Sequence, residues 1–96
     1  NTLYLTGDGI FNINNSSMPA IYVSDALVIQ ASSLYVSTDA SDKPVIGSYI
    51  GDCKNITIES GAHVYASGGC KAVGTSLSSG TEENINISDG TLIYEQ

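Results

Sequence analysis

The sequence predicts an all-β fold, a right-handed parallel β-solenoid (β-helix) with three strands per coil and about four coils. Three observations lead to this prediction. Short segments that alternate apolar and polar residues repeat along the chain, turn-forming residues follow them, and no window has the apolar spacing of an amphipathic helix. We expect residues 1–96 to form a single β-solenoid domain, which is either a whole protein or a segment of a longer repeat protein.

The first strand of each coil is the most regular element. It recurs three times at intervals of 29 residues, and a further copy lies 24 residues before the first of these. Each copy alternates apolar and polar side chains, as a half-buried strand does. The four copies are residues 3–6, 27–30, 56–59 and 85–88.

A second and a third strand follow in each coil. The turns before the second strand contain Gly, Asp, Ser and Ala, and the first three residue types suit tight turns. Copies of the second strand are expected at residues 11–13, 34–36, 64–66 and 93–95, each with its middle residue pointing outward. Copies of the third strand are expected at residues 19–21, 44–46 and 71–73, and loops at 37–43, 48–54 and 75–83.

The alternation also predicts the interior of the solenoid. Side chains at the same position of successive coils should stack in apolar columns, and each large aliphatic side chain stabilises the fold by about 1.5–3 kcal/mol when fully buried. The residues predicted to point inward are Leu3, Leu5, Phe11, Ile13, Ile21, Leu27, Ile29, Leu34, Val36, Ile46, Ile56, Ile58, Val64, Ala66, Val73, Ile85, Ile87 and Ile93. No capping helix is expected at either end, so we predict homo-oligomers that form through coil ends or edges.

The composition excludes several classes of partner. The chain has three lysines, no arginine and a formal net charge of −7. Binding to nucleic acid or to anionic membranes needs clustered cations, so neither is expected. The apolar runs are too short to cross a bilayer, so membrane insertion is not expected either. The sequence begins inside a strand-like pattern, as a mature form or an excised segment would.

The two cysteines leave two alternatives open. Cys53 and Cys70 are too few for a disulfide framework, and only His63 could join them as a strong metal ligand. A disulfide between them would stabilise the fold by about 3 kcal/mol if the geometry allowed it. The alternative is two free thiols at the turns of the coils.

One stretch of the chain resembles a known group of proteins. Residues 51–69, GDCKNITIESGAHVYASGG, resemble the unit GxCxNITISGGTVTATGG of large repetitive surface proteins of Gram-positive and gut bacteria. Residues 3–13, LYLTGDGIFNI, are similar to the opening coil of carbohydrate-binding β-helix domains. The resemblance implies a secreted or cell-surface, adhesin-like module that binds polysaccharide or a host glycan. The chain departs from the repeat pattern at Ala31, His63 and Glu95.

A row of tyrosines is the most specific candidate for a ligand-binding site. Tyr35, Tyr65 and Tyr94 occupy the outward middle position of the second strand, and Asn12 takes that position in the first coil. Stacked coils would place them in one ladder, with His63 beside it. Aromatic rings with neighbouring polar groups suit sugar rings. The alternative is structural, because like residues stack favourably on parallel sheets.

Four carboxylates form a second candidate site. Asp25, Asp52, Glu82 and Glu83 each lie two to four residues before a first strand, so stacked coils would bring them to one corner. Clustered carboxylates with loop carbonyls are what calcium binds, and no other cofactor is expected. The alternative is a solvated acidic edge.

The sequence offers little support for catalysis. The chain has no arginine to serve as the cationic base of a polysaccharide lyase, and His63 has no evident nucleophilic partner. An ice-binding solenoid would need regular threonine rows, which only Thr6 and Thr57 suggest. Two hypotheses for function remain: a non-catalytic glycan-binding module, and a structural stalk or spacer of a larger surface protein.

Overall fold

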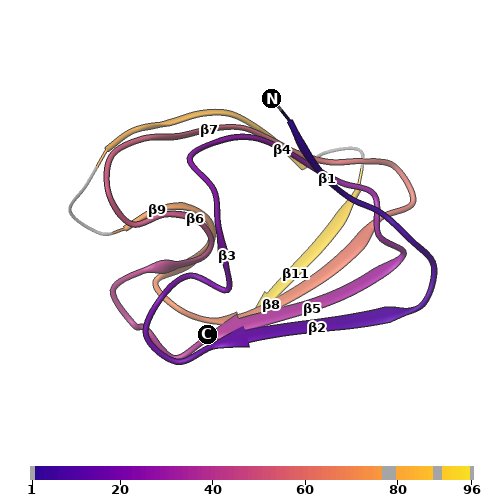
Figure 1. Cartoon of the computed structure of the whole chain (residues 1–96), viewed down its shortest axis with the longest axis horizontal. Coiled ribbons are helices and arrows are strands. Elements are labelled where there is room, and N and C mark those ends of the chain that lie inside the picture. The colour runs from indigo at the N-terminus through magenta and orange to yellow at the C-terminus, as the bar shows by residue number, and fades with distance from the viewer. Residues whose placement is uncertain (1, 77–79, 88–89, 96) are drawn as a thin grey trace.

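The repeated segments pair in parallel with their counterparts in the next repeat, because each repeat presents the same strands in the same order. The computed structural model describes residues 2–76, 80–87 and 90–95. The described part of the chain contains strands and no helix, and its three parallel sheets form a β-solenoid of about three turns. Figure 1 looks along the solenoid, so that equivalent strands overlap around a central core.

Each sheet collects one strand from successive repeats. The first sheet consists of β1 (Leu3–Leu5), β4 (Asp25–Ile29), β7 (Cys53–Ile58) and β10 (Glu82–Asn86). The second sheet consists of β2 (Ile10–Asn15), β5 (Ser33–Thr38), β8 (His63–Gly68) and β11 (Thr91–Glu95). The third sheet consists of β3 (Ile21–Tyr22), β6 (Pro44–Ser48) and β9 (Lys71–Thr75). β5, β6, β7, β9 and β10 extend by one to two residues into segments that the sequence predicts to be loops.

The predicted spacing of the first strand is confirmed by its register. Leu3 pairs with Leu27, Leu27 with Ile56, and Ile56 with Ile85. Residues separated by 24 or 29 positions in the sequence therefore stack in one column. In the third sheet Ile46 pairs with both Ile21 and Val73, as the repeat predicts. Within the described residues no helix is long and apolar enough to cross a membrane.

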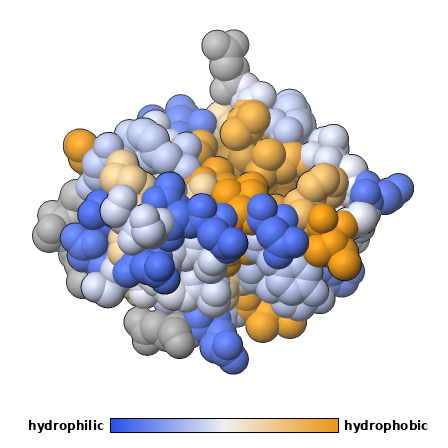
Figure 2. Space-filling view, turned by 60° about the horizontal axis from the view of Figure 1, so that its bottom comes forward, coloured by the Kyte–Doolittle hydropathy of each residue, from blue (hydrophilic) through white to orange (hydrophobic). Residues whose placement is uncertain are grey.

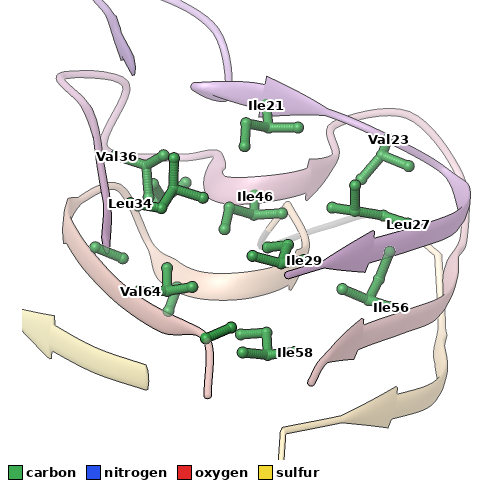
Figure 3. Close-up of a cluster of buried hydrophobic side chains, with 14 of the residues drawn as sticks. Ile21, Val23, Leu27, Ile29, Leu34, Val36, Ile46, Ile56, Ile58 and Val64 are labelled. Carbon is green, nitrogen blue, oxygen red and sulfur yellow. The ribbon is translucent and has the colours of Figure 1, made fainter. Parts of the chain in front are cut away.

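The core lies between the three sheets and is best closed in the middle coils (Figure 3). Leu27, Ile29, Ile56, Ile58 and Val64 are completely buried. Each has a coil on both sides, so parallel stacking covers it from above and below. The predicted interior is therefore correct for the middle of the solenoid.

Three residues predicted to be inside are exposed instead. Leu3 is 50% exposed and Phe11 39%, because the first coil has a neighbour on one side only. Ile93 is 52% exposed for another reason: it points away from the core. Leu5, Ile13, Val73, Ile85 and Ile87 are partly buried against the core.

One corner of the solenoid has left-handed backbone in three successive coils. Ala26, Asn55 and Asn84 have φ angles of 66°, 60° and 54°, and they occupy equivalent positions in β4, β7 and β10. Asparagine tolerates this conformation better than most residues. The Asn84 Nδ2 donates to the Asn55 Oδ1 at 3.0 Å, and the Asn55 Nδ2 donates to the Asp25 Oδ1 at 2.7 Å. These bonds connect three coils outside the core.

Both cysteines are free thiols, which settles the alternatives left open by the sequence in favour of unbridged residues. Cys53 is completely buried at the start of β7. Burial raises the pKa of its thiol above the ordinary value, so Cys53 remains protonated at neutral pH. It serves as a small apolar residue of the core.

Candidate functional site

The outward face of the second sheet carries three parallel columns of side chains, because every second residue of β2, β5, β8 and β11 points away from the core. The four strands lie side by side along one side of the solenoid (Figure 1). In strand order, the middle column consists of Asn12, Tyr35, Tyr65 and Ile93. The columns on either side consist of Ile10, Ser33, His63 and Thr91, and of Asn14, Ser37, Ser67 and Glu95.

Two of the predicted tyrosines form a stacked pair. The ring centroids of Tyr35 and Tyr65 are 4.6 Å apart, and their planes differ by 14°. Tyr35 is 41% exposed. Each ring covers one face of the other, so the pair presents ring edges and phenol hydroxyls to the solvent, with less open ring face than a sugar-stacking platform has.

The prediction that Tyr94 continues this ladder is wrong. Ile93 pairs with Tyr65, and Tyr94 pairs with the inward-facing Ala66. The Tyr94 hydroxyl donates to the Gly68 carbonyl at 2.7 Å and also lies 3.2 Å from the Gly69 carbonyl. Burial, and then the nearby Cys70, raise the pKa of the Tyr94 phenol above its ordinary value. The Tyr94 side chain therefore packs against the core and helps to cover it at the last coil.

The shift of register has a physical reason. The predicted alignment placed Glu95 in the interior column of Val36 and Ala66, where an unpaired carboxylate would be costly. In the structure Glu95 pairs with Ser67 on the outward face. Moving the strand by one residue turns every side chain over, which also turns Tyr94 inward and Ile93 outward.

A groove of about 370 Å³ runs over the tyrosine pair and the polar column beside it. Six of its lining residues are the ring pair Tyr35 and Tyr65 and the column Asn14, Ser37, Ser67 and Glu95. The Ser37 hydroxyl donates to the Asn14 side-chain oxygen, which joins two neighbouring coils. We call this hollow the tyrosine groove.

Asn12 and His63, the other two predicted ligand-binding residues, do not line the tyrosine groove. Asn12 does lie next to Tyr35 in the middle column, as predicted, but it borders a separate hollow at the first coil. His63 is exposed in the column of Ser33 and Thr91 and is not among the residues that line the groove. Sequence reasoning missed the serines of the groove. Their spacing was the available signal, since Ser37 and Ser67 each follow a tyrosine by two residues.

The four predicted calcium ligands do not gather into one site. Asp25 accepts the bond from Asn55, Asp52 accepts one from the Thr81 backbone amide at 2.9 Å, and Glu83 pairs in register with Lys54. The fourth, Glu82, has its own partners. Among the described residues, no three His, Cys, Asp or Glu side chains form a group that could hold a metal ion.

Glu82 instead joins two sheets at the last corner of the chain. Its Oε2 lies 2.7 Å from the Lys71 ammonium and 2.9 Å from the Thr75 backbone amide. Burial alone would raise the pKa of the Glu82 carboxyl, but the hydrogen bonds from Lys71 and Thr75 outweigh burial and lower the pKa below its ordinary value of 4.5. The ionised form is thus favoured by folding.

This pair predicts a pH-dependent effect of Glu82→Gln. A lowered folded-state pKa stabilises the fold fully above the unfolded value, and that contribution is lost as the pH falls through the folded value. We expect the wild type to be more stable than the variant by at most about 1 kcal/mol at pH 7, because the ion pair is partly exposed. The difference should shrink below pH 4.5. Urea midpoints from pH 7 to pH 3 would measure it. Glu83→Gln is the charge-matched control, and equal behaviour of both variants would contradict the assignment.

Comparison with known protein families, with curated proteins and with solved structures found no match. The proposed function therefore depends on the geometry of this chain. Two features bear on it directly, the tyrosine groove and the formal net charge of −7.

Proposed function

We propose that this chain is a non-catalytic glycan-binding module, adhesin-like and secreted or displayed at a cell surface, and that it binds neutral glycans in the tyrosine groove. The observation that carries the proposal is the side-by-side arrangement of a ring pair and a column of polar groups. The groove combines the edges and hydroxyls of Tyr35 and Tyr65 with the side chains of Asn14, Ser37 and Ser67.

The chemistry of the groove suits a chain of sugar rings. The C–H groups of a sugar pack against apolar surface, while its hydroxyls need donors and acceptors placed at their edges. Serine hydroxyls both donate and accept, and the Glu95 carboxylate accepts from sugar hydroxyls. Neighbouring coils repeat these groups at about 4.8 Å, the spacing of strands in a sheet. An open groove buries only part of a ligand, so the affinity for each sugar is modest.

The charge of the molecule narrows the class of glycan. Among the described residues that line the groove, Glu95 is the only one with a charged side chain, and the whole chain carries a formal net charge of −7. A negative surface repels uronic acids, sulfated sugars and nucleic acids. Neutral polysaccharides and neutral host-surface glycans are the proposed ligands.

The proposed handedness and number of coils fit a role at the cell surface. We propose a right-handed solenoid of about four coils, since parallel strands with a crossover connection are right-handed in nearly all proteins. The similarity of residues 51–69 to the repeats of bacterial surface proteins agrees with this proposal. Repeats of this kind extend by stacking, so a short solenoid suits display on a longer chain.

A second candidate function is a structural spacer. The observation in its favour is the contact between the two tyrosine rings, which stabilises the sheet without any ligand. On this hypothesis the groove is a consequence of stacking similar coils. The two candidates differ in what happens when the polar column is removed.

Tyr35→Ala and the double variant Ser37→Ala with Ser67→Ala should each weaken binding to a neutral polysaccharide by about tenfold or more, since each removes contacts in the groove. A panel of neutral and uronic-acid polysaccharides, screened by affinity electrophoresis, would identify the ligand for this comparison. Tyr22→Ala is the matched control. Tyr22 is 55% exposed and belongs to another ring pair, with Tyr49, outside the tyrosine groove.

Three results would contradict the proposal. A neutral ligand whose binding falls equally in Tyr22→Ala would place the site elsewhere. Tight binding to acidic glycans alone would overturn the argument from charge. Binding to no glycan in the panel would favour the spacer.

A further inference from the structure

The tyrosine groove is longer across the strands than along them. Its lining residues come from β2, β5, β8 and β11, and the two outer strands of this set lie three strand spacings apart, or about 14 Å. Along each strand the lining reaches only from the ring column to the polar column beside it, a step of two residues, or about 7 Å. The long axis of the groove therefore crosses the strands and follows the axis of the solenoid.

The ring pair forms one wall of the groove. Tyr35 and Tyr65 lie on neighbouring strands with their centroids 4.6 Å apart, so the wall is continuous over β5 and β8. The column of Ser33 and His63 lies on the other side of the rings, and neither residue is among the described residues that line the groove. A ligand in the groove thus lies beside the rings and does not cross them.

Each coil places one polar side chain along the groove. Asn14, Ser37, Ser67 and Glu95 follow one another in register from β2 to β11, and all four are exposed or half-buried. The bond from Ser37 to Asn14 uses one donor and one lone pair, so each side chain keeps further hydrogen-bonding groups. Figure 2 brings the side of this sheet forward and shows hydrophilic and hydrophobic side chains next to each other. Polar groups therefore recur about every 4.8 Å beside the rings.

We propose that the groove binds a straight, β-linked neutral glycan that lies parallel to the solenoid axis, with about one sugar ring for each coil. This inference rests on the proposed function. In an extended β-linked glycan the rings follow one another in a row, and each ring advances the chain by about one strand spacing. An α-linked glycan curves, so its successive rings leave the row of polar groups.

The dependence of affinity on glycan length tests the fit. Oligosaccharides of cellulose, chitin and β-mannan, each in a series of increasing length, would be titrated into the 96-residue chain by nuclear magnetic resonance. Each added sugar should tighten binding by about threefold or more, because it gains a hydrogen bond on the next coil. The gain should stop at about four sugars, when all four strands are occupied. Amylose oligosaccharides contain the sugar of cellulose in α-linkage, and their affinity should not rise in this way.

Serine substitutions on the two sides of the ring pair test the direction of the glycan. Ser37→Ala and Ser67→Ala should each weaken binding of a four-sugar ligand by about threefold or more. Ser33→Ala is the matched control, because Ser33 belongs to the same strand as Ser37 but lies across the rings from the groove. Glu95→Ala should weaken binding of the four-sugar ligand more than that of a two-sugar ligand over the ring pair, which does not reach β11.

The possible results separate this inference from the proposed function. An affinity independent of length, an equal loss in Ser33→Ala and Ser37→Ala, or a preference for amylose over cellulose would overturn the inference, while neutral glycan binding would stand. The same holds if no β-linked series binds but another neutral polysaccharide does. Failure of every neutral glycan to bind would overturn both.

Discussion

Replacing Ile58 by alanine should lower the free energy of unfolding by about 2–5 kcal/mol. Ile58 lies in β7 with no exposed surface, and Ile29 covers it from the preceding coil. The core there is enclosed by three sheets, so the walls cannot collapse into the space that the side chain leaves (Figure 3). Urea unfolding followed by far-ultraviolet circular dichroism would measure the change.

The same substitution at Ile50 provides the control. Ile50 is 67% exposed and follows β6, so Ile50→Ala should change the unfolding free energy by less than about 0.5 kcal/mol. If both variants lost the same small amount of stability, the coils would not stack as described. A larger loss at Ile58 with an unchanged slope against urea would support a cavity in an otherwise unchanged fold.

Gly47→Ala should destabilise the fold at least as much as Ile58→Ala does. We expect it to lower the free energy of unfolding by about 3 kcal/mol or more, because backbone strain and a steric clash add together. Gly47 has a φ angle of +139° and pairs with Gly74 in the third sheet. A Cβ atom at Gly47 would lie 1.9 Å from the Gly74 carbonyl oxygen. The two coils would have to separate to admit a methyl group, which would break the pairing of β6 with β9.

Gly51→Ala separates the two contributions. Gly51 also has a positive φ angle, +81°, but a Cβ atom there would meet nothing within 4 Å. Only the conformational strain remains, so we expect Gly51→Ala to lower the free energy of unfolding by about 1–2 kcal/mol. Equal thermal midpoints for the two variants would mean that the close approach of Gly47 and Gly74 does not matter for stability.

The sequence was sufficient to predict the sheets and the middle of the core. Leu27, Ile56 and Ile58 recur at fixed intervals with alternating polarity, and parallel stacking converts that pattern directly into columns. The sequence signals for the third strand are weaker, and its register of Ile21, Ile46 and Val73 is nonetheless confirmed. The fold is predictable here because each coil repeats the strand order and the register of the preceding coil.

The last coil could not be predicted in the same way. Between Ile85 and Leu92 the chain is one residue shorter than between Ile56 and Val64, so equal spacing no longer applies to β11. Two features decide the register instead: the cost of burying Glu95 and the carbonyl partners that Tyr94 finds at Gly68 and Gly69.

Only the two aromatic residues of the candidate site followed from the sequence. Tyr35 and Tyr65 stand in line as predicted. The contact between their rings depends on side-chain angles, which repetition does not fix. The separate bonds of Asp25, Asp52 and Glu82 likewise depend on local partners. Side-chain pairing at corners is decided in three dimensions, where backbone amides and neighbouring coils compete for each carboxylate.

The stacked tyrosines also give the molecule an optical signature. The chain contains no tryptophan, so its near-ultraviolet absorption comes mainly from its six tyrosines. Two nearly parallel rings 4.6 Å apart couple their electronic transitions, and the coupling changes with small rotations of either ring. Near-ultraviolet circular dichroism should therefore report the state of the groove without any label, with Tyr35→Phe providing the assignment.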